Sequence, residues 1–136
     1  MPTRILFLDD SSERRSIFRH VHRSDEIRHD VCETAAEAIE LLTARTSDSA
    51  QTPSPYDIAY LDHDLGDQIY VESGPGTGFE VAQFIAAMDP QERPRQVVVH
   101  SHNPDGARRM VMLLEDHDVP ATWVPFAMLA EQWREE

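Results

Sequence analysis

Short apolar runs alternate along the chain with longer amphipathic stretches. Five runs of aliphatic, β-branched and aromatic residues predict strands, at 4–10, 29–34, 56–62, 96–102 and 120–126. The stretches between and after them predict helices, at 11–23, 35–45, 79–89, from about 106 onward and at 127–136. Strands that alternate with helices in this way predict a parallel sheet with helices on both of its faces.

The pattern therefore indicates an α/β fold, with a doubly wound, five-stranded parallel sheet in the middle of a three-layer sandwich. The 136 residues fit one domain, 1–136, because no linker or internal repeat divides them. Residues 46–55 predict a polar loop rich in proline and serine. Residues 66–78 are turn-rich and long for a connection in such a fold, and their glycines would let them act as a lid.

Charge and composition narrow the range of functions. The formal net charge of −13 repels phosphate backbones, so duplex DNA is not expected as a partner, although a local metal ion with arginines could still attract a phosphate. The single cysteine, Cys32, can form neither an internal disulfide nor a cysteine-based zinc site, which favours a reducing, cytoplasmic setting. No apolar run is long enough to span a bilayer, and no membrane partner is expected.

Polar side chains gather where the predicted strands end. In a parallel sheet of this kind the ligand binds at the carboxyl ends of the strands. Six side chains are expected at that edge: Asp9, Asp10, Asp62, Asp64, His100 and His102. Asp9, Asp10 and Asp62 would repel one another without a cation, and hard oxygen ligands suit Mg²⁺ or Mn²⁺. The alternative is that these aspartates cap the helices that follow, and it is strongest for Asp10.

The arrangement resembles the receiver domain of bacterial response regulators, which has a flavodoxin-like fold. The matching segments are LDD at 8–10, YDIAYLD at 56–62, VVVHS at 97–101 and VPF at 124–126. The resemblance implies that Asp9 and Asp10 hold Mg²⁺, that Asp62 is phosphorylated and that the Ser101 hydroxyl senses the phosphoryl group. Receivers carry a lysine where this chain has Val124, and they lack so long a segment at 66–78.

A narrower family resembles the chain more closely, namely the cyclic-phosphate processing receiver-like domains. The joint signature comprises LDD, LDHDLG at 61–66, TGFEV at 77–81 and HSHNPDG at 100–106. The resemblance implies a metal-dependent phosphoesterase that opens a cyclic phosphate, in a 2′,3′-cyclic RNA terminus or a small cyclic nucleotide.

The residues also point to this chemistry without the resemblance. Opening a cyclic phosphodiester needs a Lewis acid, an activated water and an acid for the leaving oxygen. Four side chains are candidates for the reaction itself: Asp62, His63, Asp64 and His100. Four more are candidates for binding the phosphate: Arg14, Ser101, His102 and Asn103. Each histidine could instead be structural, and Arg14 could belong to a solvated helix face.

Two other functions stay open. The chain could be a stand-alone receiver that a kinase or acetyl phosphate phosphorylates at Asp62 and that binds a protein partner. It could also be a pseudo-receiver that binds partners or a nucleotide without chemistry. The absence of a receiver lysine at Val124 favours the phosphoesterase, whose partner would be a phosphate-containing small molecule or an RNA terminus.

Overall fold

One parallel sheet forms the centre of the molecule. The computed structural model describes residues 2–47, 55–65 and 72–135. The strands are β1 (Thr3–Leu8), β2 (Ile27–Cys32), β3 (Ile58–Leu61), β4 (Val97–Val99) and β5 (Ala121–Trp123). The helices are α1 (Ser12–Val21), α2 (Ala35–Ser47), α3 (Gly78–Ala87), α4 (Pro104–Asp116) and α5 (Phe126–Glu135). All four strand pairs are parallel, and the strand order is β2-β1-β3-β4-β5.

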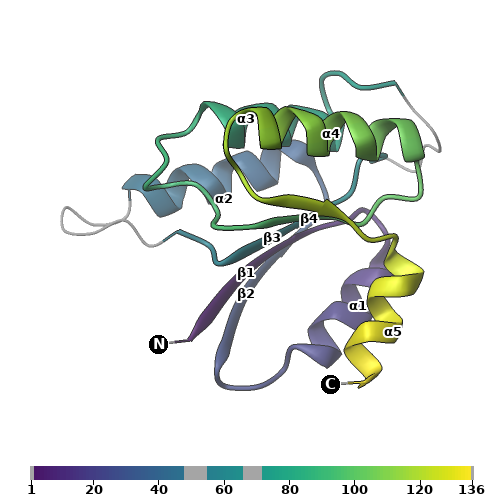
Figure 1. The fold of residues 1–136 in the computed structure, drawn as a ribbon. Helices are drawn as coiled ribbons and strands as arrows, with labels where there is room; N and C mark the ends of the chain where they lie inside the picture. The colour runs from purple at the N-terminus through teal and green to yellow at the C-terminus, as the bar shows by residue number, and fades with distance from the viewer. Residues whose placement is uncertain (1, 48–54, 66–71, 136) are drawn as a thin grey trace.

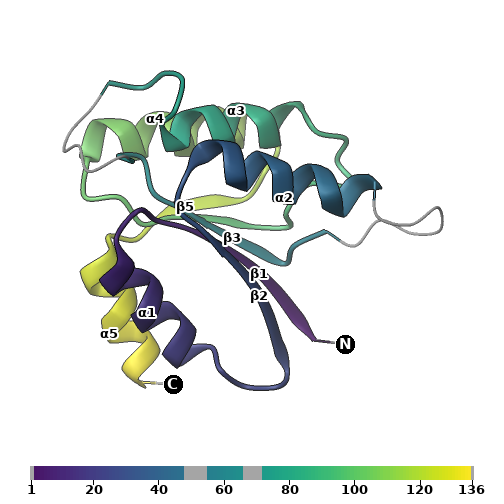
Figure 2. The same cartoon turned by 180° about the vertical axis from the view of Figure 1, so that it is seen from behind.

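The helices cover both faces of this sheet. α1 and α5 lie on one face, and α2, α3 and α4 lie on the other (Figures 1 and 2). The central strands are buried on both sides, which explains why they are continuous apolar runs such as Val97–Val99. The predicted α/β three-layer sandwich is therefore confirmed.

Each face of the sheet has its own core. Beneath α2, α3 and α4 the core is aliphatic, with Leu6, Leu61, Ile85 and Met110 among its buried members. The core beneath α1 and α5 is aromatic, and the Phe7 and Phe18 rings stack with centroids 4.4 Å apart. Such pairs add to the free energy of burial and hold α1 against β1.

Side-chain caps position the helix starts near the carboxyl edge of the sheet. Ser11 caps α1 by accepting a hydrogen bond from the Arg14 amide. Thr77 caps α3, and Asn103 caps α4 directly before Pro104. α4 therefore begins two residues earlier than the predicted start at about Gly106.

Four of the five predicted strands are longer than the observed ones, and the second, predicted at 29–34, is as long as β2 but displaced by two residues. The segment 29–34 was expected to end at Thr34, but β2 ends at Cys32 because Thr34 caps α2 instead. The segment 96–102 yields only Val97–Val99 as strand, and the chain then turns toward the Asn103 cap. Most of the 46–55 loop and the first part of the 66–78 lid candidate lie outside the described residues, since 48–54 and 66–71 are not described.

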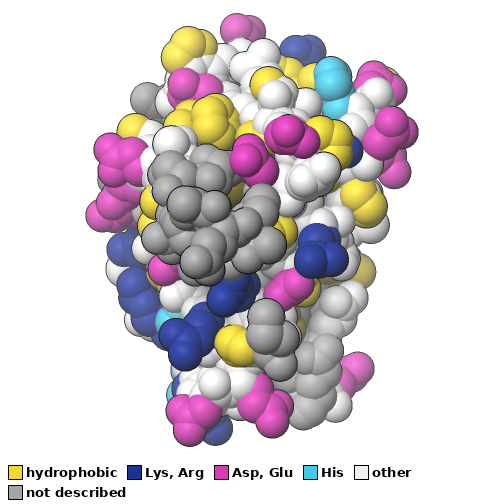
Figure 3. Space-filling view, turned by 90° about the vertical axis from the view of Figure 1, so that its left-hand side faces the viewer, with side chains coloured by type: hydrophobic (Ala, Val, Ile, Leu, Met, Phe, Trp, Pro, Cys, Tyr) yellow, Lys and Arg dark blue, Asp and Glu magenta, His cyan; other side chains and the backbone are white. Residues whose placement is uncertain are grey.

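Charge is unevenly distributed on the surface. On the face in Figure 3, arginine side chains gather in one part while acidic side chains are spread over much of the view. All twelve basic side chains are arginines, because the sequence contains no lysine. Among the described residues, none of the helices has the length and apolar character that crossing a bilayer requires.

Candidate functional site

Three polar residues lie side by side where β1, β3 and β4 end. Backbone hydrogen bonds hold them there, because each residue's N–H donates to a carbonyl of the neighbouring strand. Asp9 donates to Cys32, Asp62 to Leu8 and His100 to Leu61, over 3.1, 3.2 and 2.9 Å. The sheet thus continues through its hydrogen bonds to the first residue beyond each strand, and it brings residues 91 positions apart into contact.

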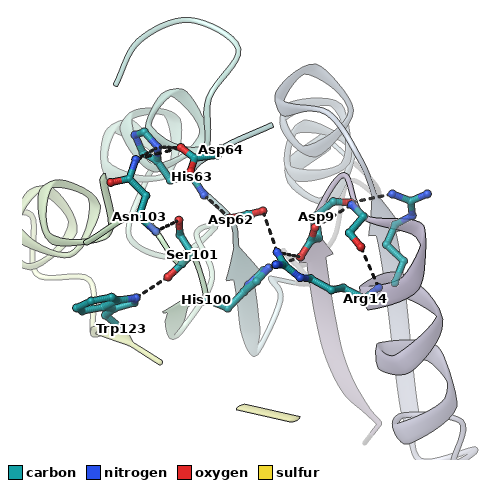
Figure 4. A network of polar contacts seen from close by, with 11 residues as sticks. Asp9, Arg14, Asp62, His63, Asp64, His100, Ser101, Asn103 and Trp123 are labelled. Atoms are coloured by element: carbon teal, nitrogen blue, oxygen red, sulfur yellow. Dashed lines mark hydrogen bonds and ion pairs between the residues drawn. The ribbon is translucent and has the colours of Figure 1, made fainter. Parts of the chain in front are cut away.

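The three side chains form one buried group. Asp9 and His100 are fully buried, and Asp62 is 4% exposed. One ligand atom from each residue lies within 4.8 Å of the others. Figure 4 shows Asp9, Asp62 and His100 converging from three different segments. We call this set the Asp-Asp-His group.

Hydrogen bonds fix the two members from β1 and β4. His100 Nε2 lies 3.0 Å from Asp9 Oδ2, and Asp9 Oδ1 accepts from the Ser11 N–H at 2.9 Å. The His100 ring stacks on Phe7 with centroids 4.9 Å apart, which orients it toward Asp9. Its Nδ1 atom has no hydrogen-bond partner within the described part of the chain.

Arg14 brings positive charge to the group from the first turn of α1. Its Nη1 atom lies 3.5 Å from Asp9 Oδ2 and 3.8 Å from Asp62 Oδ2. The guanidinium stands 5.5 Å from the centre of the Phe126 ring, a cation–π contact that restrains it. Arg14 is therefore placed where a phosphate could replace one of the carboxylates as its partner.

The two carboxyl groups have opposite pKa shifts. Burial raises the pKa of Asp62 to about 6, and the charges of Asp9 and Asp10 add to this, whereas His100 and Arg14 oppose it. Burial alone would also raise the pKa of Asp9, but the hydrogen bond and charge of His100, the Ser11 N–H and Arg14 hold it below its usual value. Asp62 is thus the carboxylate whose charge is poorly compensated.

The Asp-Asp-His group fits a divalent cation. Carboxylate oxygens and an imidazole nitrogen are the donors that Mn²⁺ accepts, and the oxygens alone suit Mg²⁺. The three donors are buried and close enough to share one ion. Burial, with a smaller contribution from the charges of Asp9 and Asp10, raises the pKa of Asp62, and a bound cation would stabilise its charged form. Asp9, Asp62 and His100 would hold the ion.

A crevice of about 770 Å³ opens beside the group. Its walls include four of the predicted site residues besides Asp62: Asp10, Arg14, Asp64 and His102. Asp10 therefore borders the crevice and is not a member of the buried group. His102 is mostly exposed, and its partial desolvation together with the charges of Arg14 and His100 lowers its pKa.

His63 lies in a second cluster, away from Asp9. Its Nδ1 atom is 2.8 Å from Asp64 Oδ1, and Asn103 Nδ2 donates to that same oxygen at 3.1 Å. Successive residues of an extended segment point to opposite sides, so Asp62 faces the Asp-Asp-His group while His63 faces α4. His63, Asp64 and Asn103 therefore lie together, separate from His100.

Ser101 lies outside the crevice. Its side chain is fully buried, its hydroxyl accepts from the Asn103 N–H at 3.0 Å, and its carbonyl accepts from Trp123 Nε1. The structure places His100, one position earlier, toward Asp62. Val124 stands half-buried where receivers carry lysine, and its N–H donates to Val99.

The residues that orient the site carry no recognisable signal in the sequence. From the sequence, Phe7 and Phe126 are expected only as core residues. Nothing in their spacing indicates that the Phe7 ring stacks on His100 or that the Phe126 ring contacts Arg14. Ser73 is likewise not indicated by the sequence, because it is ten residues from the histidine it contacts in a stretch without a periodic pattern.

Several solved structures with the same fold are response regulators or their receiver domains. The Mn(2+)-bound form of response regulator Rcp1 is 17% identical, with a TM-score of 0.61, and the match covers 98% of this chain and 91% of that one. The phosphorylated cyanobacterial phytochrome response regulator RcpA is 15% identical over 99% and 91% of the chains, with a TM-score of 0.63. A CheY-like receiver domain from Methylobacillus flagellatus is 14% identical over 99% and 98%, with a TM-score of 0.63.

No curated protein matches the sequence. A family match covers most of the chain, residues 4–116, and its description is cyclic-phosphate processing receiver domain. The fold, the acidic residues at the strand ends and this match agree. The chain belongs to the family of cyclic-phosphate processing receiver domains.

Proposed function

We propose that this domain accepts a phosphoryl group on Asp62, as a stand-alone receiver, while Asp9 and Asp62 hold a divalent cation. The observation that carries the proposal is the place of Asp62 at the end of β3, in the wall of the crevice and beside Asp9 and Arg14. The similar structures described as Mn(2+)-bound and as phosphorylated support it. The sequence alone favours the phosphoesterase, whereas the similar structures give more support to the receiver.

The transfer step uses groups that line the crevice. Asp62 Oδ2 attacks the phosphorus of a donor such as acetyl phosphate, a new O–P bond forms, and the bond to the leaving acetate breaks. A bound divalent cation would supply positive charge to the phosphoryl oxygens and to the two carboxylates. Arg14 can bind the phosphoryl oxygens, because its guanidinium already faces Asp62 and this chain has no lysine to do so.

Incubation with acetyl phosphate and Mg²⁺ or Mn²⁺, followed by intact mass measurement, tests the proposal. One added phosphoryl group is expected on the unmodified protein, and none on Asp62→Asn. Asp105→Asn, which removes an exposed carboxylate outside the crevice, is the matched control and should be labelled normally. Labelling that persists in Asp62→Asn would contradict the proposal.

Opening of a cyclic phosphate is the second candidate function. It is favoured by His100, since a buried imidazole beside Asp9 can move a proton, and by the description of the family. Metal-dependent conversion of a cyclic nucleotide or a 2′,3′-cyclic RNA end to a monoester, followed by ³¹P NMR, would support it.

His100→Asn separates the two functions. Phosphorylation of Asp62 does not use the His100 proton, and the carboxylates of Asp9 and Asp62 would still hold the cation, so this variant should still accept a phosphoryl group. Cyclic phosphate opening would fall by at least about 100-fold, the usual scale for losing a general acid or base. If the variant loses phosphorylation but the intact protein opens no cyclic phosphate, His100 acts as a metal ligand in the receiver function.

A further inference from the structure

The second cluster contains a hydrogen-bonded relay that runs from Ser73 through His63 to Asp64. The Ser73 Oγ atom lies 2.9 Å from His63 Nε2, and His63 Nδ1 lies 2.8 Å from Asp64 Oδ1. A hydroxyl, an imidazole and a carboxylate in this order and at these distances are the constellation that activates a serine nucleophile on unrelated folds.

The hydrogen-bonding capacity of each group determines which atoms of the relay carry hydrogens. A carboxylate only accepts hydrogen bonds, so His63 Nδ1 carries the hydrogen that Asp64 receives. The other nitrogen of a neutral imidazole is then an acceptor, and the Ser73 hydroxyl donates to it. Ser73 is therefore already bonded to a base that can take its proton.

The surrounding chain holds the imidazole in place. His63 is fully buried, and a Cβ atom added to Gly106 would stand 2.4 Å from its Cγ atom. Gly106 thus lets the ring lie directly against the first turn of α4. Asn103 donates to the same Asp64 oxygen and fixes that carboxylate from the other side.

Ser73 lines a second cavity, which is separate from the crevice that Asp62 lines. The cavity has a volume of about 580 Å³ and is lined by Ser73, Asn103, Gly106 and Arg109, with Glu72, Pro104 and Asp105. The imidazole is shielded while Ser73 is half-buried at the wall, so a ligand would meet the hydroxyl first. This volume suits a small organic ligand.

We propose that Ser73 is the nucleophile of a second site, which hydrolyses small carboxylic esters. The Ser73 Oγ atom attacks the ester carbonyl, the O–C bond to Ser73 forms, and the hydroxyl proton passes to His63 Nε2. The bond to the alcohol then breaks, and the departing oxygen takes that proton. Water hydrolyses the acyl-Ser73 by the same route and releases the acid. His63 and Ser73 are catalytic residues, and Asp64 is a positioning residue.

Covalent labelling tests the site without requiring turnover. A fluorophosphonate probe reacts with activated serines, and peptide mapping should find it on Ser73 of the intact protein. A 4-nitrophenyl ester of a short acid gives the turnover. Ser73→Ala should lose the label and at least 100-fold in kcat/KM, whereas Ser24→Ala, an exposed serine elsewhere, should change neither.

Asp64→Asn guards against a purely structural explanation. The amide oxygen of the variant can still accept the hydrogen bond from Asn103, so Tm should stay within a few degrees. The amide carries no negative charge to stabilise the protonated His63, so labelling should slow at least tenfold. Peptide mapping assigns the probe to Ser73 and any phosphoryl group to Asp62, so failure of one proposal is distinguishable from failure of the other. No label on the intact protein, a label on another residue, or equal labelling of Ser73→Ala and the intact protein would overturn this inference.

Discussion

At the scale of single residues, the protonation of Asp62 affects stability below neutral pH. Its folded-state pKa of about 6 exceeds the usual 3.8, so the folded protein binds this proton more tightly than the unfolded chain does. The resulting stabilisation is fully present below about pH 3.8 and is lost as the pH rises through about 6. A shift of this size corresponds to about 2–3 kcal/mol of unfolding free energy.

Asp62→Asn removes this dependence, because an amide does not ionise. Without divalent metal the variant should be more stable than the natural chain by about 2–3 kcal/mol above pH 7, with a difference that shrinks toward pH 4. Urea unfolding at pH 4.0, 5.5 and 7.5 in the presence of a chelator measures this. A variant that is less stable at pH 7.5, or a difference that does not vary with pH, would show that Asp62 is well compensated in the folded state.

Gly106 tests how tightly the His63 ring is packed. Gly106→Ala places a methyl group within 2.6 Å of three ring atoms, and the ring cannot retreat because Asp64 and Ser73 hold both of its nitrogens. Overpacking of this kind costs about 1–3 kcal/mol, although alanine is otherwise favoured over glycine in a helix. Thermal unfolding should show a lower Tm. Gly74→Ala is the control, since nothing lies within 4 Å of its added Cβ, and an equal loss there would refute the packing argument.

At the scale of secondary-structure elements, the start of α2 depends on a reciprocal cap. Thr34 Oγ1 accepts from the Glu37 N–H at 3.1 Å, and Glu37 Oε1 accepts from the Thr34 N–H at 3.1 Å. Thr34→Ala should lower the unfolding free energy by about 1 kcal/mol. Chemical denaturation measures the change, and Thr43→Ala, inside the same helix, should stay within about 0.5 kcal/mol. A larger loss at Thr43 would mean that the cap does not determine the helix start.

The same element explains where prediction from the sequence succeeds and where it stops. Apolar runs locate all five strands and their order along the chain, since buried parallel strands need such runs. The predicted end of the second strand is wrong by two residues because Thr34 reads equally well as a strand residue and as a helix cap.

Side-chain direction at the strand ends is harder to predict. Asp9, Asp62 and His100 could be expected at one edge because topology brings strand ends together. Which of His100 and Ser101 faces Asp62 depends on the point at which the chain leaves the sheet, and the sequence pattern does not mark that point. The contact between Ser73 and His63 joins residues ten positions apart in a stretch without a periodic pattern, so the sequence does not indicate it.

At the scale of the whole molecule, the net charge of −13 works against a compact state and in favour of cation binding. Part of this charge is concentrated at the crevice, where Asp9 and Asp62 are buried and share a single arginine contact, Arg14, within the described residues. A divalent cation that binds there binds the folded chain alone, because the three ligands come together only when β1, β3 and β4 pair.

Metal binding should therefore stabilise the fold by mass action. At a concentration 100 times the dissociation constant, the unfolding free energy should rise by about 2.7 kcal/mol, and Tm should continue to rise with the logarithm of the concentration. Differential scanning fluorimetry with Mn²⁺ and Mg²⁺ measures this shift. Asp9→Asn should abolish it, because the variant lacks one of two carboxylates, while Asp105→Asn should retain it. Equal shifts in both variants would mean that the ions screen surface charge and do not occupy the Asp-Asp-His group.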